Sequence, residues 1–543
     1  MDFDYVIVGA GSAGCLLANR LSAIPGNKVC LIEAGPSDWS PFIHIPAGFM
    51  KTVTNKRLNW LYETEPSVGT NGRSIPTPRG KVLGGSSSIN GLIFNRGQRL
   101  DFDNWAQRGN VGWGYDDLLP HFKSLENYKP SVKQIFKSSA EKELRGSGGE
   151  MIVTDLNWRD PLCEAFIQSA VSMGMPVNPD YNGENEEGVS YVQRTVSGTR
   201  RMSASRAYLK PIKRRRNLKI IANAFVTKLR FEDSRVIGVE YKRSQSNQSS
   251  IFIKSSGEVI LSGGAINSPQ MLQLSGIGPG KLLQSLGIPI RCELPGVGVN
   301  LRDHYATRLT GKAKNVRTIN ELSRGPRLFG EIVKYAVGRQ SILSLGPTLV
   351  YCFWHSNELR RSNDLQISFT PASYALGRQS ELDNFPGFSI AAWVQRPESS
   401  GWVRAKSQDP FCKPIIQPNY LEAAEDQRIL VEGIKISRKL MNSSALSPYF
   451  DHEVYPGKDV QSDAELLNVA RERSNTAYHL VGSCRMAPKS DSTSVVDNNL
   501  RVRGFQNLRV VDASIMPMIP SSNVNAAVLA IAEKIATEIV RGS

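Results

Sequence analysis

The chain has 543 residues, 40% of them hydrophobic and 21% charged, which is typical of a globular protein with a substantial core. Its 66 Lys and Arg exceed its 50 Asp and Glu, giving a net charge of +16, but the excess is spread thinly and no aromatic-basic reader motif accompanies it. Nucleic-acid binding is therefore disfavoured. At about 150 residues per domain, the length predicts roughly two to four domains, or fewer large ones.

The N-terminus has the pattern of a dinucleotide-binding unit. An apolar run at residues 5–8 predicts a buried strand, and it leads into Gly9-x-Gly11-x-x-Gly14 and the helix-compatible CLLANRLSA. Gly9 permits the tight turn, Gly11 lets a pyrophosphate approach the backbone, and Gly14 lets the helix pack on the strand. A second predicted strand, residues 29–32, ends in Glu33, 19 residues after Gly14, where an acid would bind a ribose.

This motif predicts one tightly held dinucleotide. The acid disfavours the 2′-phosphate of NADP, and no second strand-GxGxxG-helix unit follows, but the motif alone does not separate NAD from FAD. A second glycine-rich segment, residues 78–97, contains Gly84, Gly85 and three serines. Its small residues would let backbone amides approach a phosphate or a flavin edge, although a flexible surface loop fits the same composition.

Two longer stretches carry a family resemblance. GKVLGGSSSINGLIFNRGQRLDFD (residues 80–103) and GAINSPQMLQLSGIG (residues 264–278) resemble the two signatures of the glucose-methanol-choline oxidoreductases, which are FAD-dependent alcohol oxidases and dehydrogenases. The likeness covers nearly the whole chain and is weakest over residues 310–460. It is greatest to bacterial alcohol, choline, polyethylene glycol and sorbose dehydrogenases.

The resemblance implies an α/β fold, α+β overall, in two domains. A Rossmann-like FAD-binding domain would comprise residues 1–155, 200–308 and 465–543. A substrate domain with a largely antiparallel sheet would comprise residues 156–199 and 309–464. Alternating runs such as LQISF and IAAWV, within the second domain, predict strands of a sheet that roofs the flavin.

The resemblance also implies a set of FAD-binding residues. The pyrophosphate would lie at the first glycine turn, the adenine at Val226, and the flavin along the second glycine segment, with Trp60 as a further candidate that is about as well explained as a core residue. Some members of the family bind FAD covalently through a histidine. This chain has Ile89 at that position, so noncovalent FAD is predicted. The cofactor-binding set is Gly9, Gly11, Ser12, Ala13, Gly14, Glu33, Ala34, Trp60, Val82, Gly85, Asn90, Gly91, Leu92, Ile93, Val226, Asp512, Ala513, Asn525 and Ala526.

The segment TAYHLVGSCRM, residues 476–486, contains one of only six histidines. The His479-x4-Cys484 spacing offers no third ligand, so no metal is predicted, and Cys484 reads as a small buried residue. A packed core histidine is the other simple interpretation. An alcohol that gives hydride to flavin must also lose its hydroxyl proton, and imidazole is suited to accept it. The segment resembles the family's YHPVGTCRM, whose histidine is the catalytic base, which implies that role for His479.

The same resemblance places the partner group at Asn525, in PSSNVNAAVL. Its amide would donate a hydrogen bond to the substrate oxygen, or it would cap the following helix, or both. Four positions depart from the family pattern and leave the pocket shape open: Leu480, Ser483, Ala487 and Val299. Leu480 replaces the proline that would help to fix the loop of the base.

The implied function is oxidation of an alcohol, preferably primary, with hydride passing to flavin N5 and electrons then passing to a quinone-type acceptor. An oxidase that uses O2, a lyase or photoenzyme of the same fold, and a nonenzymatic nucleotide-binding protein are the alternatives; choline is unsupported as the substrate. Seven cysteines without a CxxC pair fit reduced thiols in the cytoplasm. The sequence predicts no transmembrane segment, but a basic surface could touch anionic lipid.

Overall fold

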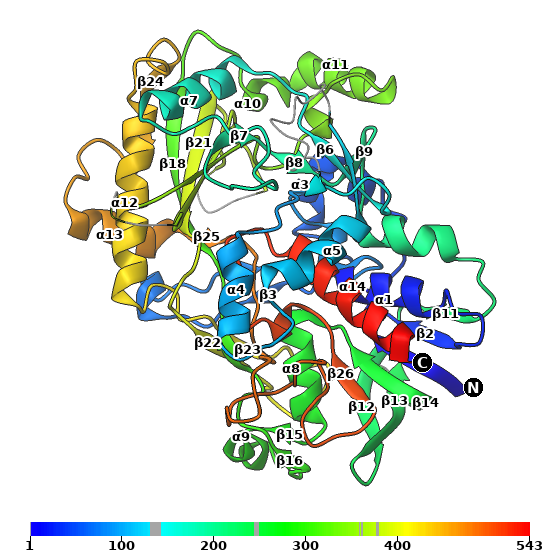
Figure 1. The fold of residues 1–543 in the computed structure, drawn as a ribbon. Helices are drawn as coiled ribbons and strands as arrows, with labels where there is room; N and C mark the ends of the chain where they lie inside the picture. Colours follow the sequence, from blue (N-terminus) through cyan, green and yellow to red (C-terminus); the bar gives the residue numbers. More distant parts are fainter. Residues whose placement is uncertain are drawn as a thin grey trace.

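The computed structural model describes residues 2–130, 143–243, 249–357, 359, 362–375 and 380–542. Two large sheets organise these residues, one in the lower half and one in the upper half of Figure 1. The fold is the predicted mixed α/β architecture, and the second sheet is antiparallel as expected. Within these described ranges, no helix combines the length and the apolar character that crossing a bilayer requires.

The first sheet has seven strands in the order β11-β2-β1-β14-β13-β12, with β26 added beside β14. Its β1-α1-β2 unit confirms the predicted strand-turn-helix-strand order. A Cβ on Gly14 would lie 1.9 Å from the carbonyl oxygen of Gly9, so only glycine lets the helix pack this closely. The elements are β1 (Asp2–Val8), α1 (Ser12–Leu21), β2 (Val29–Ile32), β11 (Leu218–Ile221), β12 (Phe225–Glu232), β13 (Arg235–Lys242), β14 (Ile251–Leu261) and β26 (Leu508–Val510).

The second sheet has the order β24-β18-β21-β20-β19-β7, with β25 beside β18. The runs LQISF and IAAWV form its central strands, as predicted, and every residue of these two strands is buried. Helices α12 (Ala424–Met441) and α7 (Pro161–Ser172) pack against the sheet. Its strands are β7 (Gly188–Tyr191), β18 (Tyr305–Ala313), β19 (Val350–Trp354), β20 (Leu365–Thr370), β21 (Gly387–Val394), β24 (Phe450–Tyr455) and β25 (Asn475–Thr476).

The C-terminal helix α14 (Asn525–Gly542) returns to the first half of the molecule. It packs against α1 and α5 (Tyr115–Leu125), far apart from it in sequence, and its apolar face is completely buried. Its N-terminus therefore points toward the glycine turn that precedes α1.

A smaller sheet of β17 (Val299–Leu301), β22 (Gly401–Arg404) and β23 (Ile415–Gln417) lies beside α8 (Gly264–Leu274). The limits of the two predicted domains stay a prediction; β18 runs through the limit at residue 308. Further helices are α2 (Pro41–His44), α3 (Phe49–Thr52), α4 (Arg99–Gln107), α9 (Gly280–Ser285), α10 (Ile319–Leu322), α11 (Gly325–Ala336) and α13 (Asp463–Arg473). Further strands are β3 (Tyr62–Glu63), β4 (Pro76–Thr77), β5 (Glu126–Lys129), β6 (Met151–Asp155), β8 (Gln193–Arg194), β9 (Val196–Ser197), β10 (Arg200–Arg201), β15 (Ile277–Gly278) and β16 (Cys292–Glu293).

Candidate active site

A cavity of about 450 Å³ lies between the two large sheets. Its lining includes Val8, Ile32 and Leu261, the carboxyl-end residues of β1, β2 and β14, which is where ligands bind in open α/β sheets. On the opposite side the lining comes from strands of the second sheet, including Ala391 and Trp393 of β21. The two halves of the molecule thus share one site.

The two glycine-rich segments meet in this cavity. Gly85 has φ +52°, and a Cβ on it would lie 2.6 Å from Cα of Gly11. The amide of Gly84 donates a hydrogen bond to the carbonyl of Ala10 at 2.8 Å. The segment after residue 78 is therefore packed onto the first glycine turn, which excludes the flexible surface loop that its composition left open.

Glu33 lies at the end of β2 and is buried beside the glycine turn. Its carboxylate accepts hydrogen bonds from the amides of Ala10 (2.9 Å) and Gly35 (2.8 Å). Burial raises its pKa to about 7, although these two amides and the charge of Lys81 act in the opposite direction. The group is an acceptor in the place expected for a ribose.

Most of the predicted cofactor-binding residues line the cavity, and three do not. Gly14 acts in helix packing, Val82 is buried with Ile43 and Leu58, and Ala526 lies in the core of the first half. The residues that line the cavity are Gly9, Gly11, Ser12, Ala13, Glu33, Ala34, Trp60, Gly85, Asn90, Gly91, Leu92, Ile93, Val226, Asp512, Ala513 and Asn525, together with His479.

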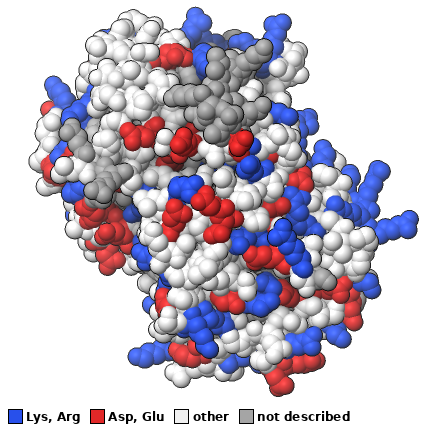
Figure 2. All heavy atoms as spheres, in the orientation of Figure 1, with Lys and Arg blue, Asp and Glu red and all other residues white. Residues whose placement is uncertain are grey.

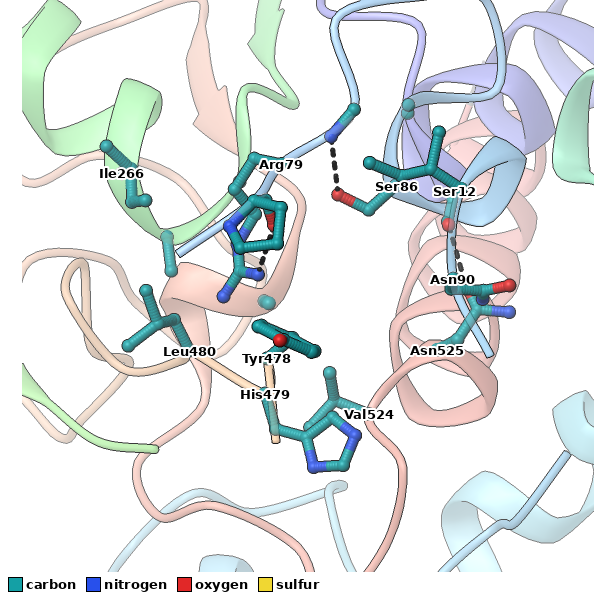
Figure 3. Close-up of a pocket in the computed structure, with 18 of the residues that line it drawn as sticks. Ser12, Arg79, Ser86, Asn90, Ile266, Tyr478, His479, Leu480, Val524 and Asn525 are labelled. Atoms are coloured by element: carbon teal, nitrogen blue, oxygen red, sulfur yellow. Dashed lines mark hydrogen bonds between the residues drawn. The ribbon is translucent and has the colours of Figure 1, made fainter. Parts of the chain in front are cut away.

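The loop that carries His479 is fixed by Asp303. One carboxylate oxygen of Asp303 accepts from the amide of His479 at 2.7 Å, and the other accepts from the hydroxyls of Thr476 and Tyr420. The neighbouring Leu480 is buried against Ile266 and other apolar side chains (Figure 3). The structure thus shows what holds the loop at a position where proline was expected: a buried carboxylate and an apolar contact.

A chain of hydrogen bonds determines which nitrogen of His479 carries the proton. Nε2 of His304 lies 2.7 Å from the carbonyl oxygen of Gln395, and Nδ1 of His304 lies 2.9 Å from Nδ1 of His479. A carbonyl only accepts, so Nε2 of His304 carries its ring proton and its Nδ1 accepts from Nδ1–H of His479. Nε2 of His479 therefore carries no proton and is the hydrogen-bond acceptor of the ring.

Both rings are neutral at pH 7. Burial lowers the pKa of His304 to about 4. Burial, then repulsion by His304 and Arg79, lowers the pKa of His479 well below 6.5. His479 is thus held in the form that can accept a proton.

Asn523, rather than Asn525, donates a hydrogen bond to this nitrogen. Nδ2 of Asn523 is 3.0 Å from Nε2 of His479, and the Tyr351 hydroxyl donates to Oδ1 of Asn523 at 3.3 Å, which fixes the direction of the amide. Asn525 instead accepts from the Ser12 hydroxyl at 2.6 Å (Figure 3). Residues two apart at a helix start do not face the same way, so the prediction that placed Asn525 opposite His479 is replaced by this arrangement.

Sequence reasoning also missed several side chains of the cavity. His304 directly follows Asp303 in a part of the chain that the resemblance covers, but no local pattern there indicates its contact with His479. Tyr351 and Arg308 come from strands in or next to the weakest part of the resemblance, and only the pairing of β18, β21, β20 and β19 brings them to the cavity.

The other departures from the family pattern are accommodated locally. Ser483 donates from its hydroxyl to the carbonyl of Ala265 at 2.6 Å, Ala487 is buried, and Val299 is exposed. Cys484 is fully buried, as predicted, and all seven cysteines are free. Within the described residues, no group of three or more His, Cys, Asp or Glu side chains could hold a metal ion.

The cavity suits a large polar ligand. Oγ of Ser262 and Nη2 of Arg79 belong to lining residues, are buried, and have no hydrogen-bond partner within the described part of the chain. Buried polar groups are normally paired. Together with the glycine turn and Glu33, they fit a dinucleotide with pyrophosphate, ribose and ring oxygens.

Comparison with known proteins agrees with this site. Models of the GMC oxidoreductase family match residues 3–306 and 397–532. The chain is 41% identical over 540 residues to an alcohol dehydrogenase [acceptor] of Pseudomonas putida, covering 99% of this chain and 96% of that protein. It is 37% identical over 557 residues to the mitochondrial choline dehydrogenase of Homo sapiens, covering 100% and 90% of the two chains.

Among solved structures, pyridoxine 4-oxidase from Mesorbium loti has a TM-score of 0.88 at 30% identity, with 99% of each chain covered. The chain therefore belongs to the glucose-methanol-choline oxidoreductase family. Its cofactor is FAD, as the family, FAD-containing structural neighbours and the dinucleotide cavity together indicate. It is an oxidoreductase of the alcohol and choline dehydrogenase type.

Proposed function

We propose that this protein oxidises a primary alcohol without a cationic group, with His479 as the base, and passes the electrons to a quinone-type acceptor. The observation that carries the proposal is the unprotonated Nε2 of His479 in the wall of the cavity, which accepts a hydrogen bond from the Asn523 amide at 3.0 Å. The base is neutral, and its proton-bearing nitrogen is directed away from the cavity by His304.

A substrate hydroxyl bound between these two side chains would give its proton to Nε2 of His479. The Asn523 amide would then donate to the oxygen as negative charge develops there. Noncovalently bound FAD would supply the hydride acceptor for the alcohol carbon. Tyr351, on the amide oxygen of Asn523, keeps the amide nitrogen toward the reacting oxygen.

The charge of the lining favours a substrate without a positive group. The lining includes the guanidinium groups of Arg79, Arg308 and Arg473. Its only carboxylates within the described chain, Glu33 and Asp512, are already bonded to backbone amides, Asp512 to those of Gly264 and Ser514. The described lining supplies no further carboxylate to neutralise a quaternary ammonium beside its three arginines, so a neutral or anionic alcohol fits better than choline.

One relative supports an acceptor other than oxygen, because the alcohol dehydrogenase of Pseudomonas putida is named for an acceptor, whereas the choline dehydrogenase of Staphylococcus saprophyticus is named as oxygen-dependent. The second candidate is an oxidase that reduces O2, favoured by the structural likeness to pyridoxine 4-oxidase. Free cysteines agree with a reducing compartment such as the cytoplasm.

The test is anaerobic reduction of the bound flavin. The purified protein is mixed without oxygen with neutral, anionic and quaternary-ammonium alcohols, and bleaching of the visible flavin band is timed; oxygen or a quinone dye is then added. We expect bleaching by neutral or anionic primary alcohols and faster recovery with the dye. His479→Gln should slow bleaching about 10²–10⁴-fold while the flavin stays bound. Unchanged bleaching would exclude His479 as the base, and flavin that stays on acid-precipitated protein would show covalent attachment.

A further inference from the structure

Helix α11 (Gly325–Ala336) turns its apolar side to solvent. Phe329, Ile332, Val333, Ala336 and Val337 recur at helical spacing and are all exposed. The exposed fractions of the larger ones are 69% for Phe329, 46% for Ile332 and Val333, and 65% for Val337. Figure 1 shows this helix at the upper edge of the molecule, projecting from the second half.

The side of α11 that faces the protein is held by polar contacts. Glu331 is buried, its carboxylate accepts from the amide of Ile342 at 2.9 Å, and the Ser341 hydroxyl donates to its carbonyl. The Tyr335 hydroxyl donates to the carbonyl of Thr199 at 3.0 Å. These bonds fix the rotation of the helix about its axis, so the apolar stripe is a built feature and not a result of fraying.

A second exposed apolar group lies on the other side of the β9–β10 hairpin. Trp39 is 87% exposed and Phe42, in α2 (Pro41–His44), is 44% exposed. α2 contacts β10, and Ile43 accepts a hydrogen bond from the Arg201 side chain of that strand. The hairpin therefore joins α2 to α11, which meets it through Tyr335.

Positive charge lies between and around these apolar groups. Arg200 belongs to β10, which α2 contacts, and the Arg206 guanidinium donates to the carbonyl of Arg201 in the same strand. Burial, and after it the charges of these two arginines, lowers the pKa of His44, whereas Asp38 acts in the opposite direction. Burial raises the pKa of Tyr335, and the same two charges act against that rise. Within the described chain, neither arginine has a carboxylate at salt-bridge distance. Lys and Arg side chains also stand at the upper edge of Figure 2, where Figure 1 shows α11.

We propose that this surface, composed of α11, Trp39, Phe42, Arg200 and Arg206, docks on an anionic lipid membrane. Exposed Trp and Phe side chains next to unpaired arginines are the combination by which interfacial helices bind lipid headgroups and the acyl boundary. An apolar stripe alone would fit a second copy of the chain equally well, but the arginines would then have to be buried against a surface that supplies no extra negative charge. The net charge of +16 favours the lipid.

The surface borders one end of the cavity. α11 contacts the turn at residues 342–344, which also contacts residues 46–48, and the chain leads from these two turns to the lining residues Pro347 and Phe49. Docking itself does not depend on the proposed acceptor.

The test is sedimentation of the FAD-containing protein with vesicles of phosphatidylcholine alone or mixed with phosphatidylglycerol. We expect binding to the mixed vesicles that weakens with salt, and little binding to phosphatidylcholine. Phe329→Glu with Val333→Glu should weaken binding at least tenfold, and Arg200→Gln about fivefold, in line with the effect of one basic residue near a charged surface. The matched control is Val68→Glu with Val111→Glu, which changes two valines that are more exposed than Phe329 and Val333 and lie outside this surface.

Flavin content and turnover of a short water-soluble alcohol with a soluble dye should be the same in all these variants, which separates loss of docking from misfolding. Equal binding to both kinds of vesicle would overturn the assignment to anionic lipid. A protein that binds no vesicle, but changes from dimer to monomer with Phe329→Glu and Val333→Glu, would show that a second copy covers the stripe and would also overturn it.

Discussion

The two ends of the cavity are built from different parts of the chain. The nucleotide end consists mainly of backbone, with glycines at positions where a Cβ would collide with neighbouring main chain, as at Gly9 and Gly85. The substrate end consists of side chains from distant segments, such as His304, Tyr351 and Asn523. A backbone site recognises one constant ligand, whereas a side-chain site can change its substrate without altering the fold.

The largest effect should come from a steric change at the nucleotide end. Gly85→Ala would place a Cβ 2.6 Å from Cα of Gly11 at a residue with φ +52°, so the two glycine segments would have to separate. We expect the flavin bound per protein after gel filtration to fall close to zero. Gly26→Ala is the control, because no atom lies within 4 Å of a Cβ there. Full flavin retention by Gly85→Ala would contradict the backbone description of this end.

Asn523 and Asn525, two residues apart, belong to different ends of the cavity, so their substitution should have different effects. Asn523→Ala should lower kcat about 10²–10³-fold with flavin retained, because it removes a donor to the developing negative charge. Asn525→Ala should chiefly weaken FAD retention, because its contact is with Ser12 of the glycine turn. Stopped-flow flavin reduction and flavin titration measure the two effects, and the reverse assignment would hold if Asn525→Ala carried the larger loss in kcat.

A smaller effect is expected for the charge of the substrate end. Arg308→Gln removes a lining guanidinium, which also lies over the Tyr374 ring. We expect the ratio of kcat/KM for choline to that for a neutral alcohol to rise about tenfold, the size of one weakened charge contact. Arg404→Gln, which changes an exposed arginine outside the cavity, serves as the control. An unchanged ratio would mean that Arg308 does not face the substrate.

The smallest effect concerns pH, and it should differ between the two ends. The pKa of His479 is lowered well below 6.5, so the base stays neutral and kcat/KM should change less than about twofold between pH 7.5 and 6.5. The pKa of Glu33 is raised to about 7, so FAD affinity should strengthen as the pH rises through 7 and the carboxylate ionises. Initial rates at saturating FAD and flavin titrations across this range test both. A fall in kcat/KM centred at pH 6.5 would mean that His479 has an ordinary pKa.

The lowered pKa values of the two histidines also make the stability of the fold depend on pH. In the unfolded chain His304 and His479 take up protons near pH 6.5, whereas in the folded chain they stay neutral to lower pH. The unfolded state therefore binds more protons below pH 6.5, and stability falls as the pH is lowered through that value.

Most of the residues that the sequence predicts for the dinucleotide line the cavity, and their signals are local. Gly9 to Gly14 and Glu33 lie within one strand-turn-helix-strand unit, and their spacing alone places them. The contact of Gly85 with Gly11 could be suspected from composition but not assigned. The substrate end was predicted only where the family resemblance reached, at His479, because strand pairing, which no local pattern encodes, brings Tyr351 and Arg308 to it.

Local sequence pattern does not decide which of Asn523 and Asn525 contacts His479. Both stand in one short segment, both face the cavity, and only the point at which α14 begins decides which contacts His479 and which contacts Ser12. Trp60 was likewise ambiguous between core and site; it lines the cavity, stacks on Tyr62 and lies under the Lys81 ammonium.

The chain of nitrogens behind His479 ends on the carbonyl of Gln395, and a peptide carbonyl cannot take up a proton and pass it on. Among the described residues, this chain of nitrogens therefore offers no relay by which His479, as the proposed base, could release the proton of the alcohol. That proton must leave from Nε2, through the space that the substrate occupies. The proton can consequently return to water only when the oxidised product leaves the cavity. Deuterated solvent should therefore slow the return of the enzyme to its starting protonation state more than it slows the oxidation of the alcohol.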